Sequence, residues 1–193
     1  MMATAEPQTT QTSKTRAFVQ WLYGLAESGD RGRLAALRRG LMVGEDRAYE
    51  LFRVIPPPFL DDAGPAEARR RMLLAALFAW HPLPFPAGPP THGSRNLGYS
   101  LRLLAEGQGA TADGPPEPLK RRMDALLAAP AAEVFAHLQQ IVRLLKAGDV
   151  PVDWERLLWD LRTWEHEDRR VQWDWSRAFY VGARHEGGDA HVS

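Results

Sequence analysis

The chain has 193 residues, 45% of them hydrophobic, and its 24 basic and 24 acidic side chains give a formal net charge of zero at pH 7. This length suits one domain, or two small ones, with a sizeable hydrophobic core. The sequence has no cysteine, which excludes disulfides and thiolate chemistry, and no apolar run long enough to cross a membrane. We therefore expect a cytoplasmic protein without a membrane contact.

The first half of the chain shows helical periodicity between clear breaks. Residues 1–14 carry neither a signal-peptide pattern nor an apolar stripe, so a disordered lead is expected there. Apolar residues with the spacing of one helical face then predict a first helix, at Phe18, Trp21, Leu22 and Leu25. Further helices are predicted over 31–40 (capped by Asp30 and ended by Gly40), 45–54, 65–80 and 95–107.

The second half follows a segment rich in proline and glycine, residues 107–118, which is the best candidate for a boundary between two lobes. Helices are then predicted over 119–129, 131–147, 154–164 and 166–182. The expected organisation is a disordered lead (1–14), an N-terminal helical lobe (15–106), a linker (107–118), a C-terminal helical lobe (119–182) and a flexible tail (183–193).

Strand signals are missing from the sequence, because it contains no alternating β-branched run and no Asn-Gly hairpin turn. The predicted fold is therefore all-α, a bundle of eight to ten helices with a division into two small lobes as an option.

Charge is unevenly distributed along the chain. Residues 31–146 carry 16 basic and 11 acidic side chains, whereas residues 147–193 carry 6 basic and 10 acidic ones. A basic middle could give one face an attraction for phosphate while the whole chain stays neutral. The alternative is an ordinary solvated helix surface.

Short basic clusters are the main functional lead from the residues themselves. The candidates for contact with nucleic acid are Arg38, Arg39, Lys120, Arg121, Arg122, Arg143 and Lys146. Arginine binds phosphate through a planar fork, and arginines on different helices could line one groove along a nucleic-acid backbone. Each cluster alone is unspecific.

Tryptophan is concentrated near the C-terminus, in the segment VPVDWERLLWDLRTW (150–164). Asp153 is placed to cap a helix, and Trp154 and Trp164 share one stripe with the leucines, which predicts a core role. Base stacking is the alternative for these two rings. Trp159 falls off the stripe and is the candidate interface residue, in contact with another helix or subunit.

Signatures of catalysis or metal binding are absent from the sequence. No two of the six histidines share the spacing of metal ligands on a helix, and there is no nucleophile elbow, phosphate loop or dinucleotide fingerprint. We expect no catalytic residue, no metal site, no cofactor and no small-molecule substrate.

The order of these segments resembles the CasB family, the small subunit of the type I-E CRISPR Cascade effector complex. The segments that carry the resemblance are LAALRRG (34–40), LLAALFAWH (73–81), RNLGYSL (95–101), KRRMDALLAA (120–129), HLQQIVRLLK (137–146), VPVDWERLLWDLRTW (150–164) and WDWSRAFY (173–180). The resemblance spans roughly residues 16–181, and its specificity lies in the ordered set. The segment 81–94 and the tail from 184 onward match no family pattern.

The resemblance implies a non-enzymatic, all-helical subunit in antiviral defence. Its implied partners are other Cascade subunits, a second copy of itself, the CRISPR guide RNA and the target DNA, where it would help to hold the R-loop. The family's basic positions carry over onto Arg38, Arg39, Lys120, Arg121, Arg122 and Arg143, as contacts to the sugar–phosphate backbone that read no sequence. Lys146 joins them by helix spacing alone.

Two other functions remain open from the sequence. One is a helical adaptor that binds only protein, and the other is a small helical enzyme or metal protein. A protein that holds phosphates loses affinity steeply as salt rises, whereas a pure adaptor would bind no nucleic acid.

Overall fold

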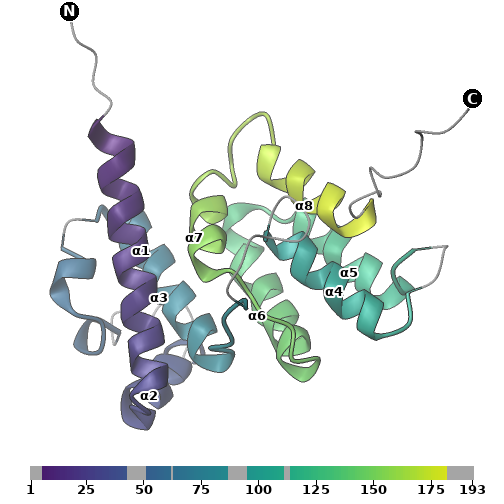
Figure 1. Cartoon of the computed structure of the whole chain (residues 1–193). Coiled ribbons are helices and arrows are strands. Elements are labelled where there is room, and N and C mark those ends of the chain that lie inside the picture. Colours follow the sequence, from purple (N-terminus) through teal and green to yellow (C-terminus); the bar gives the residue numbers. More distant parts are fainter. Residues whose placement is uncertain (1–5, 43–50, 62, 87–94, 111–113, 182–193) are drawn as a thin grey trace, which may run out of the picture.

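The computed structural model of the protein describes residues 6–42, 51–61, 63–86, 95–110 and 114–181. In these ranges the chain folds into eight α-helices joined by turns and short 3-10 segments, without a β-strand (Figure 1). The predicted all-α bundle of eight to ten helices is confirmed. The helices are α1 (Glu6–Glu27), α2 (Arg31–Met42), α3 (Pro65–Trp80), α4 (Leu97–Gly107), α5 (Glu117–Ala128), α6 (Ala131–Ala147), α7 (Trp154–Arg162) and α8 (Arg170–Tyr180), with the 3-10 helix η2 (Pro57–Phe59) before α3.

Helix boundaries agree with the sequence signals where these are local. Asp30 accepts a hydrogen bond from the backbone N–H of Arg33 at 2.9 Å, and Asp153 accepts one from the backbone N–H of Arg156 at 2.9 Å. Both carboxylates therefore cap helix N-termini, as predicted. Pro65 occupies the first turn of α3, where its missing N–H costs nothing.

Two boundary predictions are wrong. Helix α1 begins at Glu6, so residues 6–14 are helical and do not belong to a disordered lead. They have no large apolar side chain to give a periodic signal, and Pro7 lies in the first turn, where proline is tolerated. Gly40 does not end α2, and a Cβ at this position would collide with the side chain of Leu51. That glycine permits close packing instead.

Two further predictions concern segments that the structure covers little or not at all. Most of the helix predicted over 45–54 and the whole tail 183–193 lie outside the described residues.

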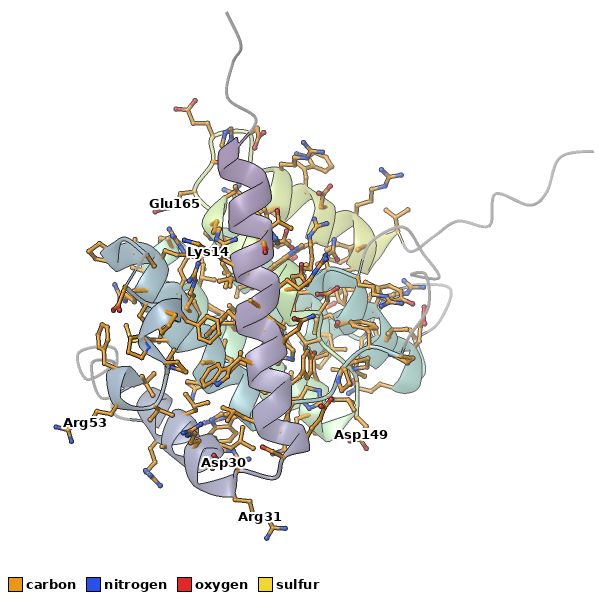
Figure 2. The ribbon with its side chains drawn as sticks, turned by 60° about the vertical axis from the view of Figure 1, so that its left-hand side comes forward. Lys14, Asp30, Arg31, Arg53, Asp149 and Glu165 are labelled. Atoms are coloured by element: carbon orange, nitrogen blue, oxygen red, sulfur yellow. The ribbon has the colours of Figure 1, made fainter. Side chains whose placement is uncertain are left out.

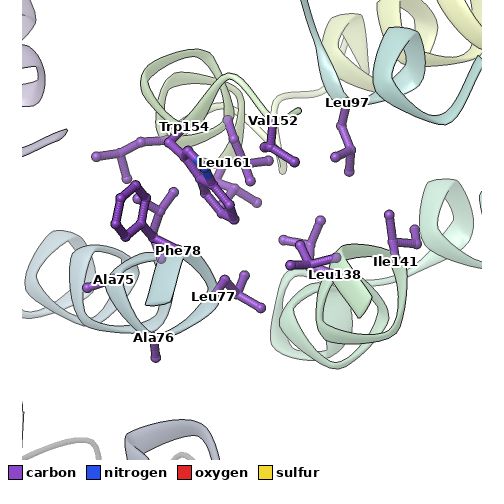
Figure 3. Packing of buried hydrophobic residues seen from close by; sticks show 14 of the residues in the cluster. Ala75, Ala76, Leu77, Phe78, Leu97, Leu138, Ile141, Val152, Trp154 and Leu161 are labelled. Carbon is purple, nitrogen blue, oxygen red and sulfur yellow. The ribbon is translucent and has the colours of Figure 1, made fainter. Parts of the chain in front are cut away.

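One hydrophobic cluster joins the helices of the described chain. In Figure 3, Phe78 of α3 lies against Trp154 of α7, and Leu77 of α3 points toward Leu138 of α6. The rings of Phe78 and Trp154 meet edge to face, with centroids 5.7 Å apart. Trp154 is fully buried and Trp164 is 4% exposed, so the prediction that these two anchor the core is confirmed.

Some helices that pack together are far apart in sequence. Helix α7 packs against α3 and α1, while α4 packs against α8. Helices on both sides of residues 107–118 therefore share one core. The division into lobes at 107–118 remains a prediction.

Charged side chains lie mainly on the outside. Arg31 and Arg53 project from the edge of the molecule in Figure 2, where α1 crosses the front. Among the described helices, none combines the length and apolarity that a membrane span requires.

Candidate nucleic-acid interface

The seven predicted basic residues lie on three helices. Arg38 and Arg39 are on α2, Lys120 to Arg122 on α5, and Arg143 and Lys146 on α6. Five of them lie at two places beside α6, and the other two lie apart.

The C-terminal end of α3 collects cations from two other helices. The guanidinium of Arg143 lies 4.8 Å from the centroid of the Trp80 ring, and the ammonium of Lys146 lies 6.0 Å from it. Arg38 of α2 donates from Nε to the carbonyl oxygen of Ala79 at 2.6 Å. The aromatic face and the negative end of the helix dipole both favour positive charge at this place. We call Arg38, Trp80, Arg143 and Lys146 the Trp80 cluster.

A cavity of about 190 Å³ lies between α5 and α6. Arg121 and Arg122 line its α5 side, and His137 and Gln140 line its α6 side. Arg122 also donates from Nη1 to the carbonyl oxygen of Pro118 at 3.1 Å, which fixes part of its guanidinium beside the cavity. Two guanidinium groups and an amide provide the charge-assisted and neutral donors that a phosphate oxygen accepts.

Helix α6 connects this cavity with the Trp80 cluster. Gln140 and Arg143 are three residues apart and so lie on adjacent turns of one face. Arg143 and Lys146 are exposed, as are Arg121 and Arg122. The basic residues of the cavity and of the Trp80 cluster are together named the α6 basic band: Arg38, Arg121, Arg122, Arg143 and Lys146.

The other two predicted residues lie apart from the band. Lys120 is on the opposite flank of α5 from Arg122, where its ammonium is 4.0 Å from a carboxylate oxygen of Glu117. Arg39 is exposed on the side of α2 that faces away from the buried Leu34 and Leu37.

Trp159, the predicted interface residue, is half-buried on α7. The guanidinium of Arg162 covers its ring at 4.7 Å from the centroid, and Arg162 in turn pairs with Glu67 of α3, with Nε 3.0 Å from a carboxylate oxygen. The role of Trp159 in an interface remains a prediction.

The sequence did not single out three residues of interest on this surface and on α8. The apolar pattern identifies Trp80 only as the last residue of a helix, and His137 only as a packed or partly exposed side chain. Trp173 falls off the stripe of its helix, which does not by itself predict that the side chain is 72% exposed.

Metal-binding geometry is absent from the described ranges. No group of three or more His, Cys, Asp or Glu side chains lies within reach of one ion there.

Comparison with known proteins gives a consistent family. The sequence matches the family model for CRISPR-associated protein Cse2 over residues 33–180. CRISPR-associated protein Cse2 from Thermus thermophilus is 31% identical over 175 residues, which cover 88% of this chain and 92% of that protein.

Solved structures agree in fold. CasB from M. ruber superimposes with a TM-score of 0.65 at 26% identity, covering 87% of this chain and 93% of that one. A chain of a CRISPR RNA-guided surveillance complex, described as pre-nicking, superimposes with a TM-score of 0.67 at 26% identity, covering 87% and 92%.

Proposed function

The chain belongs to the CRISPR-associated Cse2 family, and we propose that it is a non-catalytic subunit of a type I-E CRISPR RNA-guided surveillance complex. In this role it contacts the backbones of guide RNA and target DNA without reading sequence and stabilises the R-loop. Its partners are the other Cascade subunits and a second copy of itself.

The observation that carries the proposal is the α6 basic band. It comprises cations of α2, α5 and α6 at two places beside α6, although the whole chain has no net charge. Sequence in a guided complex is read by base pairing, so a subunit that holds the strands needs only contacts to phosphate and sugar. Arginine side chains supply such contacts with little preference for sequence.

Arg39 and Lys120 are proposed as separate phosphate contacts outside the band. The ion pair between Lys120 and Glu117 is at the surface, so it costs little to break when a phosphate arrives.

The band is tested by a triple substitution, Arg121→Ala/Arg122→Ala/Arg143→Ala. Binding of single- and double-stranded DNA and RNA is measured against salt concentration, for the protein alone and in its reconstituted complex. Each lost phosphate contact should reduce the slope of log affinity against log salt by about 0.7 to 0.9. The variant should also shorten the lifetime of the R-loop.

A matched control removes three other exposed or half-exposed arginines, Arg31→Ala/Arg33→Ala/Arg102→Ala. This control removes the same number of positive charges as the band variant and leaves the band intact. Arg33 and Arg102 form local ion pairs with Asp30 and Glu106. Equal slopes and R-loop lifetimes in the wild type and the band variant would contradict the proposal. The adaptor function, with protein contacts alone, would then be favoured.

A further inference from the structure

Helix α8 exposes a large aromatic ring that neither the core nor the α6 basic band uses. The side chain of Trp173 is 72% exposed, against 51% for Phe52 and 49% for Val181, the other large hydrophobic residues exposed in the described chain. The buried face of α8 is formed by Val171, Gln172, Trp175 and Phe179. Tryptophan is usually highly buried, so its outward position on this helix needs an explanation.

Arginines flank this ring on the same face of the helix. Arg170 lies three residues before Trp173 and Arg177 four residues after it, so all three share one exposed stripe. We call Arg170, Trp173 and Arg177 the α8 stripe.

The two carboxylates nearest in sequence already have partners. Asp174 lies 3.8 Å from Nη2 of Arg156, and Asp168 accepts from the backbone N–H of Arg170 at 3.0 Å and contacts His166. The stripe therefore consists of an exposed indole ring with an exposed arginine on the helical turn before it and another on the turn after it.

The position of α8 is fixed by hydrogen bonds on its other side. Trp175 donates from Nε1 to Asp160 at 2.7 Å, and Gln172 donates from Nε2 to the carbonyl oxygen of Trp164 at 2.7 Å. Asn96 donates to the carbonyl oxygen of Asp174 at 3.1 Å. Because these contacts anchor the buried face, the stripe is held in place before any partner arrives.

We propose that the α8 stripe binds single-stranded nucleic acid, with a base stacked on Trp173 and the adjoining phosphates held by Arg170 and Arg177. Every base has an aromatic face, so stacking on tryptophan tolerates any sequence, and arginines beside the ring add charge for the backbone. A paired base inside a duplex has no free face, which restricts this site to single strands. The site rests on the proposed function and adds a second surface, on a different helix from the α6 basic band.

A strand fits this surface better than a protein partner does. A protein interface places its aromatic anchors in an apolar, water-excluding patch. The residues one turn from Trp173 are Arg169, Arg170, Ser176 and Arg177, so the ring lies among cations.

The test compares two strands that share their phosphates and differ in their bases. Fluorescence anisotropy measures binding of oligothymidine and of an abasic strand of equal length to the isolated protein and to the reconstituted complex. The wild type should bind oligothymidine at least about fivefold more tightly than the abasic strand, since one stacked base is worth that much or more. Trp173→Ala should abolish this preference and leave the affinity for the abasic strand unchanged, whereas Trp173→Phe should retain part of it.

Controls separate this site from the proposed function. Phe52→Ala removes another exposed aromatic ring and should keep the preference for bases. The band variant, Arg121→Ala/Arg122→Ala/Arg143→Ala, should weaken binding of both strands by the same factor. The stripe is refuted if Trp173→Ala keeps the wild-type preference, or if the wild type shows none in either form of the protein. If Trp173→Ala no longer assembles into the complex but still prefers oligothymidine to the abasic strand, the proposal is also refuted, because the stripe would then be a protein contact.

Discussion

At Glu67, three arginines surround one carboxylate beneath the surface. Arg70 and Arg71 come from the same helix, and Arg162 reaches it from α7. Burial alone would raise the pKa of Glu67, but the hydrogen bonds and charges of Arg162 and Arg71 outweigh it and hold the pKa below its usual value. The ionised form is therefore favoured by the folded state.

This pKa gives a definite sign to the pH dependence of stability. A carboxyl whose pKa is lowered by folding stabilises the protein above its unfolded pKa, near 4.5, and loses that contribution as pH falls. Glu67→Gln should lower the free energy of unfolding at pH 7 by about 3 to 5 kcal/mol, because it leaves buried guanidinium groups without a charge partner. Urea unfolding at pH 7 and pH 3 should show the gap between wild type and variant narrowing in acid.

A surface pair provides the control for this prediction. Glu106 pairs with Arg102 at 2.8 Å but is 52% exposed, so Glu106→Gln should change stability by less than about 1 kcal/mol at either pH. A gap between wild type and Glu67→Gln that stays constant from pH 7 to pH 3 would contradict the role of the Glu67 charge.

Asp160 shows the opposite behaviour at a second buried carboxylate. Burial raises its pKa, although Trp175 and Arg156 both donate to it. Its contribution to stability is thus largest in acid and declines as pH rises from the usual Asp value to the raised one. The loss of stability in acid that is due to Glu67 is therefore measured as the difference between the wild type and Glu67→Gln. Asp160 titrates in both proteins, so its contribution cancels in that difference.

Among the helices, the crossing of α4 and α8 depends on the absence of one side chain. A Cβ at Gly98 would collide with the backbone carbonyl of Trp175. Backbone cannot move aside as a flexible side chain can, so the two helices would have to separate.

Gly98→Ala should therefore destabilise the protein by about 1 to 3 kcal/mol, despite the better helix propensity of alanine. Gly107→Ala is the matched control on the same helix, because a Cβ there meets nothing within 4 Å, and it should be neutral or slightly stabilising. Denaturant unfolding followed by circular dichroism measures both. Equal stability of Gly98→Ala and the wild type would show that the crossing tolerates the added methyl group.

Local signals account for most of what the sequence could predict at this scale. The stripe of α6 and the caps at Asp30 and Asp153 involve residues within one turn of each other, so the sequence reports them directly. The need for glycine at positions 98 and 40 could not be predicted from the sequence, because Trp175 and Leu51, which pack against these glycines, lie on other segments.

The candidate site likewise has a part that the sequence could predict and a part that it could not. Its cations could be predicted, because basic clusters are visible in the sequence. The convergence of Arg38 and Arg143 at the end of α3 is tertiary, so no local pattern reports it.

On the scale of the whole molecule, the shared core predicts cooperative unfolding. Trp154 contacts Phe78 across the boundary proposed for the two lobes, and removing its ring should lower the free energy of unfolding by about 3 to 5 kcal/mol. Thermal unfolding of the wild type and of Trp154→Ala should each give one transition, coincident by fluorescence and circular dichroism.

Trp173→Ala provides the control, with an expected change within about 0.5 kcal/mol, because its ring is mostly in solvent. Two separate transitions in the wild type would instead mean that the lobes divided at residues 107–118 fold independently.

The link between Asn96 and the backbone of Asp174 also bears on how the protein is made. These residues lie 78 positions apart, and α8 is the last helix of the described chain to leave the ribosome. Until then, the face of α4 that receives α8 has no cover during translation. A nascent chain halted before α8 would therefore leave that face of α4 exposed to solvent, and exposed apolar surface of this kind favours aggregation.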